Sequence, residues 1–99
     1  MQWIIIEEGK MKRVRPPVHP GEILKEEFLV PMGLSANKFA QESGLDGTRI
    51  SQIIRGRRGI TADTALVLAK YFKVSPEFWM NLQTRYDLEV AQSKLVSAG

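Results

Sequence analysis

A chain of 99 residues with 43% hydrophobic and 25% charged content is sized for one globular domain with a single small core. The absence of cysteine excludes disulfides, thiolate metal sites and cysteine nucleophiles. The net charge of +3 comes from the segment Ala36 to Arg58, which has five basic and two acidic residues, because both flanking segments are neutral. A phosphate-binding surface requires such a local excess of positive charge.

The chain begins with an extended segment and a basic arm. Trp3–Ile6 is aromatic and β-branched, which favours a short strand, and we expect another copy or another protein to pair with it. No basic region precedes this cluster, so it does not resemble a secretory signal. Lys12, Arg13 and Arg15 follow, either as a solvated tether or as an arm that reaches a DNA minor groove. Residues 1–18 are therefore treated as an extension of a domain at 19–95.

The first helix is expected from Pro20 to about Leu29. His19 stands at its cap, and proline is favoured at the first helical position. Pro31 biases the residue before it away from the helical conformation, which ends the helix. Its buried side is expected to consist of Ile23, Leu24 and Phe28.

The stretch Ala36–Arg55 has the spacing of a helix-turn-helix. Ser35 and Asp46 are suited to cap its two helices. Gly44 falls in the turn, where one position needs a positive φ, and Ala40 supplies the small residue where two helices cross closely. The side chains expected to lock the pair are Phe39, Leu45, Ile50 and Ile53. The alternative is an ordinary pair of helices joined by a glycine, with no ligand.

Two more helices complete an all-α fold of five helices. Gly56 is a natural stop after Arg55, and Thr61 caps the fourth helix. Ser75 and Pro76 begin the last one. The core-facing residues of these helices are Ala65, Leu68, Ala69, Phe72, Trp79, Leu82 and Tyr86. The longest apolar run, within the fourth helix, is far shorter than the roughly 20 residues that span a bilayer, so no membrane partner is expected.

The outer face of the second motif helix is predicted to read DNA bases in a major groove. Arg49 suits a two-pronged contact to guanine, Gln52 suits adenine, and Thr48 suits a thymine methyl or a phosphate. Gly47 would let the backbone approach closely. The residues predicted to contact phosphates are Asn37, Lys38, Ser51, Arg55, Arg57 and Arg58. One exposed arginine alone could be a solvated charge, but counterion release rewards a cluster.

A single recognition helix covers only a few base pairs, so a two-fold dimer with recognition helices roughly 34 Å apart is expected. The last helix carries apolar side chains on more than one face. Its predicted dimer residues are Met80, Tyr86, Leu88 and Val90. The alternative is that these side chains only seal the core of the monomer.

Enzymatic chemistry is not expected from this residue inventory. His19 is the only histidine, and its place beside a proline indicates a structural role. Without cysteine, a second histidine or a phosphate loop, no nucleophile–base pair or metal cluster can be assembled. We therefore expect no catalytic residue, no metal and no cofactor.

Four pieces of the chain carry a family resemblance: HPGEILKEEF at 19–28, the helix-turn-helix, RRGITADTALVLAKYF at 57–72 and PEFWMNLQTRYDL at 76–88. From about Lys12 to Leu95 the chain resembles the HigA family of antitoxins, a branch of the Cro/C1-type (XRE, lambda repressor-like) helix-turn-helix proteins once labelled virulence-associated protein I. The first ten residues fall outside this pattern. The resemblance implies a cytoplasmic homodimer that binds a palindromic operator in double-stranded DNA at its own promoter.

The same resemblance implies a tight complex with a HigB-like toxin, a RelE-type mRNA endonuclease. The first helix presents a charged face that suits a basic, RNA-cutting partner. The candidate toxin-binding residues are Glu22, Lys25, Glu26 and Glu27. An ordinary solvated helix face is the alternative at this surface, and a transcriptional repressor without a toxin is the alternative function.

Overall fold

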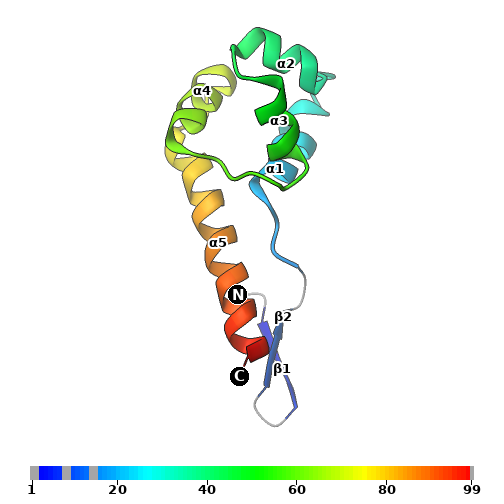
Figure 1. Cartoon of the computed structure of the whole chain (residues 1–99), viewed down its shortest axis with the longest axis vertical. Helices are drawn as coiled ribbons and strands as arrows, with labels where there is room; N and C mark the ends of the chain where they lie inside the picture. The colour runs from blue at the N-terminus through cyan, green and yellow to red at the C-terminus, as the bar shows by residue number, and fades with distance from the viewer. Residues whose placement is uncertain (1–2, 8–9, 14–15, 99) are drawn as a thin grey trace.

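The computed structural model describes residues 3–7, 10–13 and 16–98, which form a helical head, a long projecting helix and a β-hairpin (Figure 1). In chain order the elements are β1 (Trp3–Glu7), β2 (Lys10–Arg13), α1 (Pro20–Ile23), η1 (Leu24–Leu29), α2 (Ala36–Ser43), α3 (Gly47–Ile54), α4 (Ala62–Phe72) and α5 (Pro76–Ala98). Since α1 and η1 form one continuous helix, the described residues contain five helices, which confirms the prediction.

The first helix starts as expected but changes its winding after one turn. The Gly21 N–H donates to Nδ1 of His19 at 2.9 Å, which confirms the cap. In η1 the hydrogen bonds span five residues, as in the 2.9 Å bond from the Val30 N–H to the Lys25 carbonyl. This π-helical winding, which the sequence pattern did not predict, brings residues five apart to one side. Both Leu24 and Leu29 are buried there.

The helix-turn-helix has the predicted turn and caps. The Lys38 N–H donates to Oγ of Ser35 at 3.1 Å, and the Thr48 N–H donates to Oδ1 of Asp46 at 3.1 Å. Gly44 closes α2 with φ +80°, a conformation that a Cβ would strain. A Cβ on Gly47, the first residue of α3, would lie 3.9 Å from Cβ of Ala40 on α2. Ala40 is therefore the small residue at the crossing of the two helices, as predicted.

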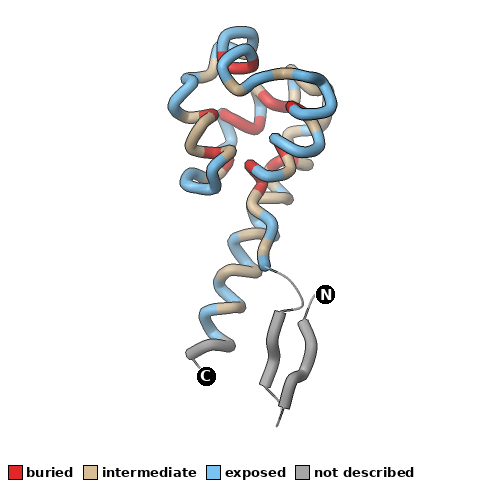
Figure 2. Tube along the Cα trace, turned by 90° about the vertical axis from the view of Figure 1, so that its right-hand side faces the viewer, coloured by how far each residue is buried: buried red, intermediate tan, exposed pale blue. Residues whose placement is uncertain are grey.

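Among the residues whose burial is described, the core lies in the head (Figure 2). Its buried apolar residues are Leu24, Leu29, Phe39, Ala40, Ile50, Ile53, Ile60, Ala65, Leu68 and Trp79. Phe28 joins the helices around it, because its ring centroid lies 4.9 Å from that of Phe72 and 4.9 Å from that of Trp79. Such aromatic contacts add to the stabilisation from buried area. The helix α3 is therefore packed between the first helix, α2 and α4.

Only the first part of α5 packs into the head. The helix has 23 residues, which gives it a length of about 35 Å at 1.5 Å per residue. Trp79 is its only fully buried residue among those whose side chains are described. The second half of α5 projects away from the head (Figure 1), and the molecule measures 52 × 24 × 22 Å. The exposed faces of the projecting half of α5 are thus available to a partner.

The N-terminal strand is present, but its expected partner was wrong. β1 pairs antiparallel with β2 of the same chain, with Ile4 opposite Lys12 and Trp3 opposite Arg13. A turn within the chain satisfies the backbone groups of β1 at a lower entropic cost than a second molecule would. The backbone of the basic arm is therefore a strand, which contacts α5 (Figure 1). Arg15 lies outside the described residues.

Candidate nucleic-acid interface

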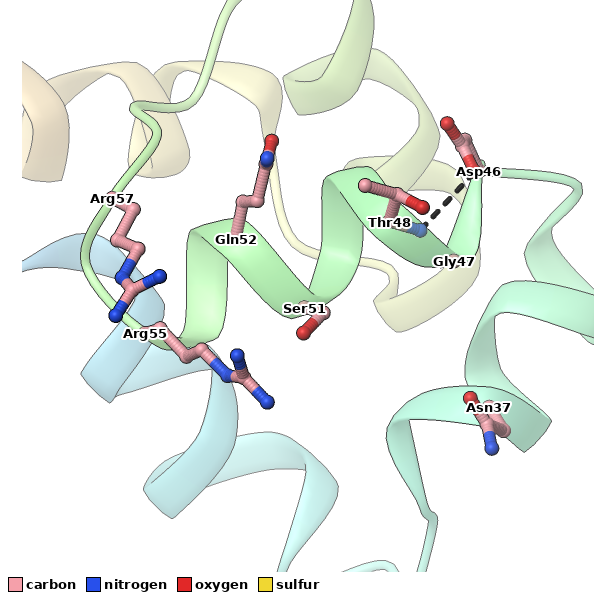
Figure 3. A pocket seen from close by; sticks show the side chains of 8 residues that line it. All are labelled: Asn37, Asp46, Gly47, Thr48, Ser51, Gln52, Arg55 and Arg57. Atoms are coloured by element: carbon pink, nitrogen blue, oxygen red, sulfur yellow. Dashed lines mark hydrogen bonds between the residues drawn. The ribbon is translucent and has the colours of Figure 1, made fainter.

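Most of the predicted DNA-binding residues lie together in one open depression along α3. Its volume is about 560 Å³, and its lining residues are Asn37, Asp46, Gly47, Thr48, Ser51, Gln52, Arg55 and Arg57. Figure 3 shows Thr48, Ser51 and Gln52 along α3, with two arginines beyond its C-terminal end and Asn37 on α2 across from it. The structure thus brings together most of the residues assigned separately to bases and phosphates.

The position of α3 depends on a very close contact with the first helix. Gly21 is buried, and a Cβ on it would lie only 1.8 Å from the carbonyl oxygen of Ile53. No side chain fits in that distance, so this position requires glycine. The contact fixes the C-terminal end of α3, from which Arg55 and Arg57 extend toward the depression. The sequence contained this glycine in the HPGE segment, but only its long-range contact reveals why it is needed.

Arg49 does not line the depression, which differs from its predicted role as a guanine reader. Its Nη1 donates to Oδ2 of Asp63 at 2.9 Å and to Oγ1 of Thr64 at 3.2 Å, both on α4. The arginine side chain is 33% exposed. In this structure Arg49 therefore joins α3 to α4. Both α4 partners lie 14 and 15 residues further along the chain, so no local sequence pattern pointed to them.

The acidic partner of Arg49 has a strongly lowered pKa. The hydroxyl of Thr61 donates to the carboxylate of Asp63, and this bond together with the one from Arg49 lowers the pKa of Asp63 to about 2. Asp63 is consequently ionised throughout the range in which DNA binding is measured. Thr64, the buried polar side chain beside it, completes the group.

Two of the predicted phosphate contacts lie outside the depression. Lys38 on α2 is exposed, and its Nζ lies 3.7 Å from the Glu42 carboxylate one turn away. Arg58 is exposed next to Arg57 in the connection between α3 and α4. Both flank the depression in sequence, Lys38 beside Asn37 and Arg58 beside Arg57, so they remain candidates for the backbone on either side of a groove.

The predicted dimer residues divide between the core and the surface. Met80 is half-buried and packs against the core, and the ring of Tyr86 lies 4.8 Å from that of His19 in an edge-on arrangement. Val90 is half-buried, whereas Leu88 is 59% exposed. Leu88 also lines an open depression of about 310 Å³ on α5. The strongest remaining candidate for a contact with a second copy is thus Leu88.

The four charged residues predicted for the toxin contact are all exposed on the first helix. Glu22, Lys25 and Glu26 line a second depression of about 290 Å³, together with His19 and Arg55 at the end of α3. Glu27 lies outside it. The charged face of the first helix therefore adjoins one end of the DNA-facing surface.

Neither a metal cluster nor a membrane-spanning helix is present among the described residues. In the ranges 3–7, 10–13 and 16–98 no three histidine or acidic side chains are grouped so that they could hold a metal ion. None of the helices in those same ranges has both the length and the apolar character needed to cross a bilayer.

Comparison with known proteins gives consistent matches. The helix-turn-helix family model matches residues 24–79. Virulence-associated protein I of Dichelobacter nodosus is 52% identical over 81 residues, which cover 82% of this chain and 75% of that protein. An addiction module antidote protein of the HigA family from Coxiella burnetii is 49% identical with a TM-score of 0.76, covering 81% of this chain and 87% of that one. Pseudomonas aeruginosa antitoxin HigA, solved with the higBA promoter, is 42% identical with a TM-score of 0.77, covering 79% and 85% respectively.

Proposed function

This chain belongs to the HigA family of helix-turn-helix antitoxins, and from that premise we propose that it binds its own operator as a homodimer and neutralises a HigB-like toxin. The family consists of DNA-binding antitoxins and regulators, so the chain is not an enzyme. The toxin is inferred to be a RelE-type, ribosome-dependent mRNA endonuclease. Both partners, the operator and the toxin, place the proposed function in the cytoplasm.

The observation that carries the DNA part is the depression along α3. It combines polar side chains that can read base edges with two arginines that can bind phosphate, on a segment that holds the net positive charge of the chain. The depression is open and runs along one helix, which suits a DNA groove better than an enclosed small-molecule site. The P. aeruginosa relative, solved with a promoter, supports the same use of the motif.

Within this surface we assign base reading to Thr48 and Gln52. Both side chains face the depression, and Gly47 leaves the backbone at the start of α3 open to close approach (Figure 3). Arg49 acts through its bond to α4 in the free protein. Phosphate binding falls to the residues that surround this pair: Asn37, Lys38, Ser51, Arg55, Arg57 and Arg58.

Dimerisation is assigned to the projecting part of α5. That part leaves the head and carries exposed Leu88 beside half-buried Val90. An exposed leucine on a helix that the rest of its chain does not cover is suited to bury against a second copy. Two copies related by a two-fold axis would present two α3 helices to the two halves of a palindrome.

The toxin contact is assigned to the charged face of the first helix. Glu22, Glu26 and Glu27 are exposed there, and acidic side chains complement a basic RNA-cutting enzyme. Coexpression of the tagged chain with the reading frame beside its gene tests the assignment. We expect the neighbour to co-purify, and Glu26→Lys with Glu27→Lys to abolish the complex, whereas Glu77→Lys on α5 leaves it intact. A chain that binds its upstream DNA but captures no such protein would instead be a stand-alone repressor.

A further inference from the structure

The connection between α3 and α4, which carries Arg57 and Arg58, is held at both ends by one face of α5. At its far end, Oε1 of Gln83 accepts a hydrogen bond from the Ile60 N–H at 2.7 Å. The Ile60 side chain is itself buried in the core, at 3% exposure. The two arginines before it are exposed, and the Arg57 N–H donates to the Gln52 carbonyl at 2.8 Å, which ties the first of them to the end of α3.

The fit around the Gln83 amide is close. A Cβ on Gly59 would lie 3.0 Å from its terminal atoms, so the backbone of the connection lies directly against the amide. Nε2 of Gln83 donates to Oδ1 of Asp87 at 2.9 Å, one turn further along α5. This second bond orients the amide so that its oxygen faces the Ile60 N–H. Gln83 is therefore fixed on both sides.

The near end of the connection is held through His19. Gly56 has φ +74°, and a Cβ on it would lie 3.7 Å from Cγ of His19, so the imidazole packs on the backbone where α3 ends. The other side of the imidazole meets the ring of Tyr86 on α5 at 4.8 Å. Tyr86 and Gln83 are three residues apart, which places them on the same face of a helix.

We propose that Gln83, together with the Tyr86–His19 pair, positions Arg57 and Arg58 for contact with the DNA backbone. The span between the two anchors, Gly56 and Ile60, consists of Arg57, Arg58 and Gly59, and Arg57 lines the depression on α3 (Figure 3). Because the backbone of this span is already ordered in the free protein, less conformational entropy is lost when its side chains bind phosphate. Because α5 also carries the proposed dimer contact, the same helix links assembly to phosphate binding. The inference rests on the proposed operator binding.

The loss of phosphate contacts changes DNA affinity in a different way from the loss of a base contact. Phosphate contacts carry no sequence information, so their loss weakens operator and non-operator DNA alike and reduces the dependence of affinity on salt. Loss of a base contact weakens only the operator. A residue that supports the fold alone would lower the melting temperature without changing the affinity of the folded protein.

The test compares Gln83→Leu with Gln83→Glu and with Glu77→Leu, a control substitution at an exposed position near the start of α5, in the full-length chain. Affinities for the operator and for a non-operator duplex are measured at several salt concentrations, well below each melting temperature. We expect Gln83→Leu to weaken both duplexes by the same factor, about five- to thirtyfold, and to reduce the salt slope by roughly one to two. Gln83→Glu keeps an acceptor for the Ile60 N–H but loses the donor to Asp87 and is repelled by its carboxylate, so it should recover only part of the loss, while Glu77→Leu should bind normally.

Three outcomes decide the matter. Parallel loss on both duplexes with a smaller salt slope supports the inference. Unchanged affinities of a folded, dimeric Gln83→Leu protein, or a loss confined to the operator, would overturn it while leaving the proposed function in place. Failure of the unaltered chain to prefer its operator would overturn both.

Discussion

The guanidinium of Arg49 on α3 lies 2.9 Å from the carboxylate of Asp63 on α4, and the same Nη1 also donates to Thr64. The arginine that sequence reasoning placed in the major groove is thus bound to the neighbouring helix. The pKa of Asp63 is lowered to about 2. Its contribution to folding stability is therefore complete above its ordinary pKa of about 4 and is lost as the pH falls from there through about 2. The pair is therefore intact under all ordinary binding conditions.

If Arg49 positions α3, removing either partner should have the same effect on DNA binding. We expect Arg49→Ala and Asp63→Ala each to weaken operator binding by roughly threefold to tenfold, with little further loss in the double variant. Quantitative gel shifts on the upstream region provide the measurement. A guanine-reading Arg49 would behave differently, because Asp63→Ala would free the guanidinium and leave binding unchanged or stronger while Arg49→Ala abolished it.

Gly21→Ala on α1 is expected to be far more destabilising than Gly47→Ala on α3. Its Cβ would overlap the carbonyl oxygen of Ile53, and neither backbone can move without shifting a whole helix. A loss of about 3 kcal/mol in the free energy of unfolding, at the upper end of the usual cost of overpacking, follows from this overlap. Gly47→Ala is the matched control, because the nearest atom to its Cβ would be 3.9 Å away. Urea unfolding followed by circular dichroism would contradict this account if the two variants were equally stable.

The stability of the chain should decrease as the pH falls below about 6.5. Burial lowers the pKa of His19, although Asp87 and Glu22 oppose that shift. The unfolded state therefore binds more protons than the folded state once the pH is below the unfolded pKa, and the loss is complete below the lowered folded pKa. Protonation would also remove the Nδ1 acceptor that caps α1.

Thermal unfolding between pH 5 and pH 8 measures this effect. His19→Asn keeps a capping side chain but has no titratable group, and His19 is the only histidine. We expect the melting temperature of the variant to vary less between pH 7 and pH 5 than that of the unaltered chain. Equal slopes for the two proteins would remove His19 as the cause.

Leu88→Asp should produce a folded monomer with weak operator binding. A charge at the centre of an apolar contact prevents its burial, and an operator with two half-sites loses the benefit of two linked recognition helices. Leu66→Asp on α4 is a well-matched control, because Leu66 is 61% exposed and Leu88 is 59% exposed. Sedimentation should find the first variant monomeric and the second dimeric. A dimeric Leu88→Asp protein would exclude this part of α5 from the interface.

The features that sequence reasoning predicted correctly are local ones. The caps at Ser35 and Asp46 and the positive φ at Gly44 depend on a few adjacent residues. The features that sequence reasoning missed depend either on partners far along the chain or on a choice between two similar helical windings. The bond between Gln83 and Ile60 spans 23 residues, and the winding of η1 differs from an α-helix by one residue per hydrogen bond. Arg49 illustrates the limit most clearly, since it was predicted to lie on the DNA-reading face of α3, whereas in the structure it bonds to Asp63 and Thr64 on α4.

The central claim is that the depression along α3 reads an operator through Gln52 and Thr48 while Arg57 holds the phosphates. It is tested most directly by measuring the affinities of Gln52→Ala and Arg57→Ala for the operator and for a set of duplexes that each differ from it by one base pair. We expect Gln52→Ala to lose about 1–3 kcal/mol on the operator and to lose nothing on the duplex altered at the base pair that Gln52 contacts. Arg57→Ala should weaken every duplex by the same factor. A Gln52→Ala protein that binds all of these duplexes as tightly as the unaltered chain does would contradict the account.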